Sequence, residues 1–259
     1  MRNDFLQSRS LFIEQQRSTR ILQNMLPEHI VQRMQKGDTL ISEDEQDVTI
    51  LFCDIADVDS FVNRFDPTEV VSILDRVYSL FDQICQKHGV RKMETVGKTY
   101  VACAGLQGKN QGREAAFCAV SMALDMLTCL KKCRASNGNV IKLRIGIHSG
   151  RVVSGLVGTK KQQFSLFGDT ANTASRMQST GVTGRCQISY VTYKNLAKHF
   201  AFEERHIDVK GKGSMTTYLV DEPISEVAKL SFAGQIDLAF ERGLVSTSSL
   251  MIDVHRPLD

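Results

Sequence analysis

An amide and a guanidinium stand four residues apart in the segment FSLFGDTANTASRMQS, residues 164–179. They belong to Asn172 and Arg176, and this spacing places both side chains on one face of a helix. The preceding Gly-Asp-Thr turn supplies residues that can cap the start of that helix. A planar guanidinium is well suited to contact phosphate oxygens. The same pair is also common on a solvated helix face, so other residues must decide between the two interpretations.

Two carboxylates are further candidates for contact with a ligand. Asp54 directly follows the apolar run VTILFC, residues 48–53, which is typical of a strand buried on both faces. A carboxylate at the end of such a strand either contacts a ligand or caps a turn. Glu94 lies in KMETVGKTY, residues 92–100, a strand-turn-strand pattern that brings it toward the same region.

The elements that must position these residues follow one another in a recognisable order. Apolar runs predict strands, amphipathic periodicity predicts helices, and Pro67 and Gly89 mark the ends of the first long helix. The order strand, helix, strand, strand, helix, strand predicts an α+β fold with a ferredoxin-like core (βαββαβ). The predicted elements are a strand over 48–53, a helix over 67–88, strands over 90–95 and 99–104, a helix over 112–134 and a strand over 140–148.

Further elements extend this core. A turn at 148–150 leads to a strand over 150–157, and the helix of Asn172 opens near Asp169. Before the core, residues 5–34 predict a helix that Pro27 interrupts, and the polar, acidic residues 35–46 predict a linker. We therefore divide the chain into an N-terminal helix and linker (1–46), a main domain that contains the candidate site residues (47–221) and a C-terminal tail (222–259).

Composition excludes several classes of function. The 259 residues are 42% hydrophobic and have a net charge of +3 without a basic stripe, which argues against nucleic-acid binding. The seven cysteines include no CxxC pair and indicate reduced thiols. No apolar run is long enough to cross a bilayer. We expect a cytoplasmic chain, either on its own or as the cytosolic part of a larger membrane protein.

Five motifs in order, LFCDI, KMETVGKTY, LRIGIHSG, LFGDTANTASRM and VKGKG, resemble the class III nucleotide cyclase catalytic domain over roughly residues 26–220. The resemblance implies conversion of a nucleoside triphosphate to its 3′,5′-cyclic monophosphate and pyrophosphate. It also implies a dimerisation arm and a head-to-tail dimer whose sites draw residues from both subunits.

In that family the aspartate of LFCDI and the backbone carbonyl after it bind two Mg²⁺ or Mn²⁺ ions, which assigns Asp54 and Ile55 to the metals. A second metal-binding aspartate normally follows the glycine of the strand turn, and this chain has Lys98 there. An ammonium opposes the binding of a dication. The loop over 56–61 also lacks the family's Gly-Phe-Thr. Both departures resemble the second domain of tandem cyclases, whose partner supplies the metals.

The complementary residues are present. By resemblance, Asn172 orients the ribose and Arg176 stabilises charge on the α-phosphate in the transition state. Lys210 and Lys212 of VKGKG stand where the family places a lysine on the triphosphate, and we favour Lys210. Without the resemblance, both lysines would equally fit a solvated hairpin.

The choice of base follows from hydrogen-bond chemistry. Guanine presents two donors, N1–H and the N2 amino group, which a carboxylate such as Glu94 accepts, whereas the N1 acceptor of adenine would repel it. Adenylyl members of the family carry lysine at that position and an aspartate on the arm. This chain has Ser165 at the arm position, where guanylyl members usually carry cysteine, and a serine hydroxyl can donate to guanine O6.

The remaining conspicuous residues have structural interpretations. His148, at the end of a predicted strand, is expected to be structural rather than a general base. Gly150, Gly155 and Gly158 lack the context of a phosphate-binding loop and indicate turns or close approaches.

The sequence therefore predicts a guanylate cyclase, a phosphorus-oxygen lyase, that acts on GTP with a second cyclase domain as its partner. That partner is another chain, a tandem domain or a second copy. The alternative is a catalytically silent cyclase-like domain that dimerises with an active partner and regulates it. Lys98 favours this alternative, and the intact Asn172 and Arg176 argue against it.

Overall fold

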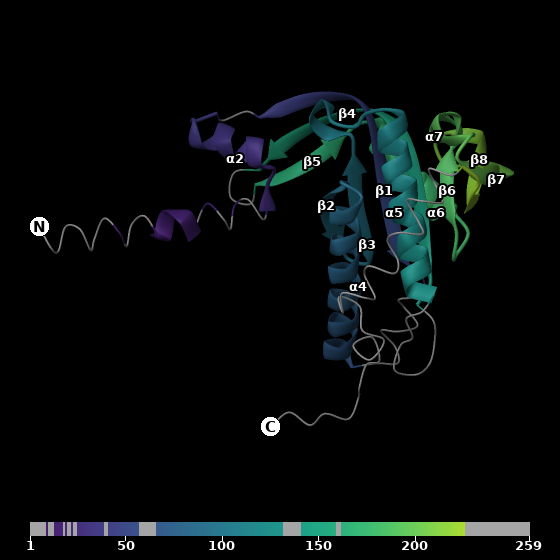
Figure 1. Ribbon diagram of the computed structural model, residues 1–259, viewed down its shortest axis with the longest axis horizontal. Helices are drawn as coiled ribbons and strands as arrows, with labels where there is room; N and C mark the ends of the chain where they lie inside the picture. Colours follow the sequence, from purple (N-terminus) through teal and green to yellow (C-terminus); the bar gives the residue numbers. More distant parts are fainter. Residues whose placement is uncertain are drawn as a thin grey trace, which may run out of the picture. The chain divides into compact units, whose positions relative to one another are not determined.

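A computed structural model describes residues 9, 13–17, 19, 22, 25–38, 41–56, 66–131, 141–158 and 162–225 (Figure 1). The chain divides into two compact units. The first unit consists of Met1–Asp44 and Val153–Phe167, and the second of Glu45–Val152 and Gly168–Asp259. Each is described by itself below.

The strands form one sheet in the order β2-β3-β1-β4-β6-β8-β7, and β5 pairs with β4 off this path. Along the chain, β1, α4, β2, β3, α5 and β4 follow the predicted βαββαβ order, which confirms the α+β fold. The strands are β1 (Ser42–Ile55), β2 (Arg91–Val96), β3 (Thr99–Ala104), β4 (Leu143–Val157), β5 (Gln163–Phe167), β6 (Cys186–Ser189), β7 (Phe200–Val209) and β8 (Gly213–Pro223). The helices are α2 (Glu28–Gln35), α4 (Pro67–Lys87), the 3-10 helix η1 (Leu106–Gly108), α5 (Arg113–Lys131), α6 (Asp169–Ser179) and α7 (Tyr190–Leu196).

The main core lies where α4 and α5 cover one face of the sheet (Figure 1). The helix α4 begins as predicted, since the Asp66 side chain accepts a hydrogen bond from the Thr68 amide and Pro67 occupies the first turn. It ends before Gly89, which has a φ of 63°. Small side chains bring α5 close to the strands, because its alanines at 115, 116, 119 and 123 are fully buried.

The strand β1 is longer than the sequence predicted. The predicted linker over 35–46 is wrong for residues 42–46, which are the first part of β1. Acidic residues are depleted in strands, so the acidic composition of residues 42–46 favoured a linker over a strand in the sequence-based prediction. The side chain of Glu45, although charged, is buried and accepts a hydrogen bond from the backbone N–H of Gln107 at 2.9 Å.

The strand β4 also differs from the prediction. It runs without a break through residues 148–150, where the sequence predicted a turn between two strands. Glycine at 150 serves close packing instead, because an added Cβ would lie 2.7 Å from the Thr170 hydroxyl. The chain turns later, at Gly158, whose φ is 102°. Of the three glycines, Gly158 stands at a turn, whereas Gly150 and Gly155 permit close approaches inside β4, with an added Cβ at Gly155 3.1 Å from the carbonyl of Ile41.

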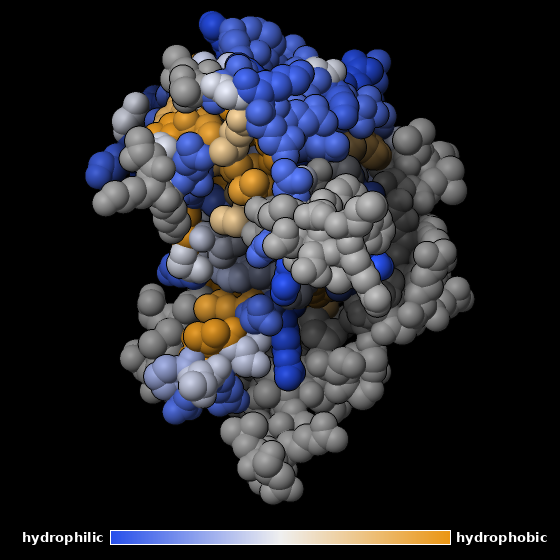
Figure 2. Space-filling view, turned by 90° about the vertical axis from the view of Figure 1, so that its left-hand side faces the viewer, coloured by the Kyte–Doolittle hydropathy of each residue, from blue (hydrophilic) through white to orange (hydrophobic). Residues whose placement is uncertain are grey.

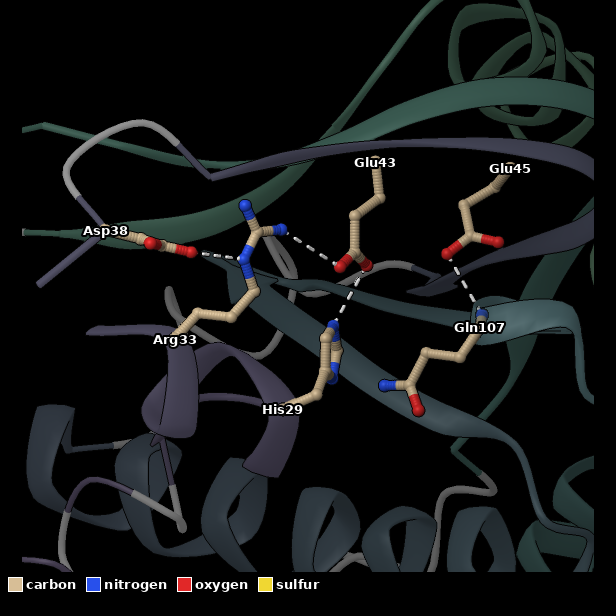
Figure 3. Close-up of polar contacts among 6 residues, drawn as sticks. All are labelled: His29, Arg33, Asp38, Glu43, Glu45 and Gln107. Carbon is tan, nitrogen blue, oxygen red and sulfur yellow. Dashed lines mark hydrogen bonds and ion pairs between the residues drawn. The ribbon is translucent and has the colours of Figure 1, made fainter. Parts of the chain in front are cut away.

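In the first unit, α2 is joined to the start of β1 by charged side chains (Figure 3). Arg33 donates to Asp38 at 2.8 Å and to Glu43 at 3.4 Å. The His29 ring lies 2.9 Å from the other oxygen of Glu43 and meets the ring of Phe164 edge-on. The predicted N-terminal helix is therefore present over 28–35, with Pro27 immediately before it, whereas much of its earlier part falls outside the described residues.

The β4–β5 hairpin of the first unit has an exposed apolar face. Val153 pairs with Phe167 and Gly155 with Ser165, so these residues and Val157 share one face. Val153, Val157 and Phe167 are all exposed, by 42%, 52% and 47%.

Figure 2 shows one side of the molecule, on which hydrophilic residues cover continuous areas and hydrophobic residues appear in separate patches.

Across the described ranges, no helix combines the length and the apolar character that a membrane crossing requires. The six cysteines in these ranges are free thiols. The predicted tail is described only to residue 225, and β8 continues into it as far as Pro223.

Candidate active site

The helix α6 carries the two residues that the sequence singled out. It begins after Gly168, whose φ of 136° suits only glycine, and it buries Thr170, Ala174 and Met177. Asn172 is exposed and Arg176 is half-buried, on the face that the spacing predicted. Within the described part of the chain, neither the Asn172 amide nor the Arg176 guanidinium forms a hydrogen bond or ion pair.

The N-terminal end of α6 is attached to two other elements. The Thr170 hydroxyl donates to the carbonyl of Arg151 on β4 at 2.6 Å. The ammonium of Lys212 forms an ion pair with both carboxylate oxygens of Asp169, which lowers the pKa of that carboxyl. Because Asp169 lies three residues before Asn172, this pair stands at the edge of the Asn172 face.

The two lysines of the β7–β8 turn are thus placed differently. Lys212 reaches α6, close to Asn172, whereas Lys210 is exposed and makes no hydrogen bond or ion pair within the described ranges. Asn172 and Arg176 lie on α6, and the side chain of Lys212 contacts this helix at Asp169. Lys210 makes no such contact with α6. No motif or spacing singled out Asp169 as the partner of a lysine 43 residues away.

Asp54 lies at the end of β1 on the face of the sheet opposite α4 and α5. Its neighbours Cys53 and Ile55 point into the core under those helices, and Asp54 itself is half-buried. One carboxylate oxygen accepts a hydrogen bond from the Thr99 hydroxyl at 2.5 Å. The Ile55 N–H donates to the carbonyl of Lys98 at 3.4 Å, so the backbone of Lys98 lies beside the end of β1.

This neighbourhood does not fit a two-metal site by itself. Among the residues that the structure describes, it offers one carboxylate, Asp54, one of whose oxygens is already an acceptor, and an ammonium-bearing residue, Lys98, stands next to it. Two ions of the size of Mg²⁺ need several oxygen ligands around them. In the described residues, no three His, Cys, Asp or Glu side chains gather as a metal-binding group.

Glu94 reaches the same face of the sheet through an irregularity in β2. Lys92 and Glu94 pair with consecutive residues of β3, so Met93 is an extra residue in a β-bulge. Residues two apart in a regular strand share a face, and the bulge therefore turns Glu94 away from the face of Lys92. Lys92 faces α4, where it pairs with Asp82 at 2.8 Å. Glu94 consequently lies on the face of Asp54, half-buried.

Ser165 is half-buried on β5, on the apolar face of the β4–β5 hairpin. Ser165 belongs to the first unit, whereas Glu94 belongs to the second.

His148 has a fixed structural partner. Its Nδ1 lies 2.6 Å from the Ser189 hydroxyl. Burial lowers its pKa to about 4, and nearby Asp169 opposes this shift only in part. The imidazole is therefore neutral near pH 7, so it cannot donate a proton from a charged form there.

Known proteins with a similar sequence belong to one family. Residues 40–222 match the family described as the adenylate and guanylate cyclase catalytic domain. Human retinal guanylyl cyclase 2 is 39% identical over 214 residues, which are 80% of this chain and 19% of that protein. An adenylate cyclase of Mycobacterium tuberculosis is 35% identical over 215 residues, which are 82% of this chain and 48% of that protein. The chain thus spans less than half the length of either relative.

Among solved structures, the guanylate cyclase domain of RhGC from Catenaria anguillulae in complex with GTP is similar to this chain, with a TM-score of 0.67 and 33% sequence identity. The similarity covers 70% of this chain and 100% of that domain.

Proposed function

Because this chain belongs to the adenylate and guanylate cyclase catalytic domain family, as its five motifs predicted, we propose that it converts GTP to 3′,5′-cyclic GMP and pyrophosphate. In this proposal it acts as the purine-binding and transition-state half of a dimer. The observation that supports this most directly is the face of α6, where Asn172 and Arg176 have no partner in the described residues. A helix needs neither group there for its own stability.

The reaction requires positive charge at the α-phosphate. The ribose 3′-hydroxyl loses its proton to solvent and its oxygen attacks the α-phosphorus, while the bond from that phosphorus to the bridging oxygen breaks and the electron pair of that bond leaves with pyrophosphate. Arg176 stabilises the negative charge that develops on the phosphate oxygens, and Asn172 orients the ribose. Lys212 can contact the triphosphate by exchanging Asp169 for phosphate oxygens, and Lys210 can do so from its solvent-exposed position.

The metal ions belong to the partner in this proposal. Asp54 and the carbonyl of Ile55 do not complete a two-ion site beside Lys98, so we assign the two Mg²⁺ or Mn²⁺ ions mainly to a second cyclase domain. That domain is another chain or a tandem domain, because a second copy would carry the same Lys98. The exposed residues Val153, Val157 and Phe167 offer it an apolar surface.

Guanine selection rests on Glu94 and Ser165. A half-buried carboxylate on the face of the sheet that carries Asp54 can accept both the N1–H and the N2 amino group of guanine. The Ser165 hydroxyl can donate to guanine O6 from the dimer surface. Because an adenylate cyclase is also among the relatives, ATP is the competing substrate in any test of this assignment.

A second candidate function follows from Lys98. If its ammonium disables every pairing, the chain is a silent domain that binds nucleotide and regulates an active partner. This candidate predicts tight GTP binding without turnover.

The test compares the purified chain with its Lys98→Asp variant in an assay of cyclic GMP formed from GTP and Mn²⁺. We expect no turnover from the chain alone and turnover from the variant, and we expect Arg176→Ala to abolish the latter. Turnover by the unmodified chain would show that a homodimer suffices. No turnover in either, with GTP bound, would favour the silent domain.

A further inference from the structure

The C-terminal end of α6 is held by side chains that no motif of the active site includes. Gln187, on β6, is fully buried, and its amide nitrogen donates to the carbonyl of Met177 at 3.1 Å and to the Thr180 hydroxyl at 2.9 Å. Its amide oxygen accepts a hydrogen bond from the Arg205 guanidinium. Both amide hydrogens and the oxygen of this buried side chain are therefore used.

These contacts form a directed chain that ends on the backbone of Arg176. Arg205 donates to Gln187, Gln187 donates to the Thr180 hydroxyl, and that hydroxyl donates to the Arg176 carbonyl at 2.7 Å. The Thr180 N–H donates to the same carbonyl at 3.0 Å. The donor of each step is the acceptor of the one before, so each side chain has one orientation that satisfies the chain.

The same end of α6 rests directly on the sheet. Gly146 of β4 pairs with Gln187 of β6, and an added Cβ at position 146 would lie 1.9 Å from the backbone nitrogen of Gln178. The helix backbone thus touches the strand at the turn that follows Arg176. The chain of hydrogen bonds sits beside this contact and fixes the rotation of the last turn.

We propose that Gln187, Thr180 and Arg205 are positioning residues, which act through the backbone of Arg176 to hold its guanidinium where the reacting phosphate stands. The inference rests on the proposed role of Arg176 in the reaction. None of the three touches the nucleotide in this account. Their loss lowers the rate of the chemical step and leaves substrate binding nearly unchanged.

The kinetic test uses a matched pair at one position, in the chain that carries Lys98→Asp, with GTP and Mn²⁺. Thr180→Val removes the hydroxyl at nearly equal volume, and Thr180→Ser keeps it. For the valine variant we expect kcat to fall about 10- to 100-fold with KM within about twofold of the parent, because a misplacement of about 1 Å costs rates of this order. The serine variant should keep the kcat of the parent.

Gln187→Leu should reproduce the valine variant, because it removes the donor to Thr180. The control is Arg185→Ala, which removes guanidinium contacts to Glu203 and Asp221 on the same sheet without touching α6. Its kcat should match the parent. A rise in KM without a fall in kcat, or equal kcat in the valine and serine variants, would overturn the proposal.

A second measurement does not depend on turnover. Hydrogen exchange of the amides over 169–181 should be faster in Gln187→Leu than in Arg185→Ala, because the last turn of α6 loses its anchor. Unchanged exchange would overturn the positioning role whatever the activity. By contrast, if exchange rises as expected but Arg176→Ala retains turnover, the proposed function fails and the anchor of α6 stands.

Discussion

Replacing Gly146 with alanine should displace the helix that carries Arg176. The added Cβ would lie 1.9 Å from the backbone nitrogen of Gln178 and 2.4 Å from its Cα. Both atoms are backbone, so no side chain can rotate away to relieve the clash. To reach ordinary contact at 3.4 Å, the strand and the helix must separate by about 1.5 Å at this point.

Two magnitudes follow from this displacement. Overpacking of this kind costs about 1–3 kcal/mol of unfolding free energy. For a domain of this size, each kcal/mol lowers Tm by about 2–4 °C. A reacting group displaced by about 1 Å costs about 100-fold in rate, so the loss of turnover should far exceed the loss of folded protein.

The assay measures Tm and cyclic GMP formation in the chain that carries Lys98→Asp, with and without Gly146→Ala. The control is Gly108→Ala, because Gly108 has a φ of 67° and an added Cβ there meets nothing within 4 Å. Its cost of about 1–2 kcal/mol arises from backbone strain alone, far from α6 in the chain. If Gly146→Ala kept the parent's Tm and turnover, the direct contact of α6 with β4 would be refuted.

Three further outcomes are expected. In the Lys98→Asp chain, Arg176→Ala should lower kcat by about 100- to 1,000-fold or more, as loss of a transition-state donor does in other enzymes. A kcat within twofold of the parent, which is a change of about 0.4 kcal/mol in activation free energy, would contradict the assignment of Arg176. Glu94→Lys combined with Ser165→Asp should shift the ratio of kcat/KM from GTP toward ATP, and an unchanged ratio would count against the base assignment. Asp169→Asn should remove a small stabilisation, under about 1 kcal/mol because the pair is exposed. Since Lys212 lowers the Asp169 pKa, this stabilisation is present above the ordinary value of 3.8 and is lost as the pH falls through the lowered pKa. Urea unfolding should therefore show a higher unfolding free energy for the parent than for the variant at pH 7, and equal values in strong acid. A difference that persists in strong acid would contradict the ion-pair explanation.

Local signals were sufficient to predict the elements that form the core. The N-cap at Asp66, the proline after it and the glycine at 89 delimit α4 by rules that act within one turn of the helix. The i, i+4 spacing of Asn172 and Arg176 likewise predicted their shared face. These features need no knowledge of distant residues.

The errors occurred where tertiary contacts override local preference. The acidic start of β1 looks like a linker, yet Glu45 is buried with a backbone partner 62 residues away in the chain. Gly150 looks like a turn, yet it makes room for the Thr170 side chain inside a continuous strand. Local propensity cannot distinguish a glycine that turns the chain from one that permits close packing.

The site itself was predictable only in part. The motifs identified Asn172 and Arg176, but not the bulge at Met93 that turns Glu94 to the face of the sheet that carries Asp54. The hydrogen-bond chain from Arg205 to Arg176 joins residues on three separate elements, and its members have no common spacing in the sequence. The burial of Gln187, which connects them, is visible only in the structure.

In the proposed function, this chain supplies the transition-state groups while a partner supplies the metal ligands. A mixture of two differently substituted copies of the chain tests this division of roles. One copy carries Lys98→Asp and Arg176→Ala, and the other is unmodified, so only the mixed dimer combines a second carboxylate with an intact Arg176. We predict cyclic GMP from GTP and Mn²⁺ in the mixture and none from either copy alone. Product from the unmodified copy alone, or none from a mixture that demonstrably forms dimers, would contradict the account.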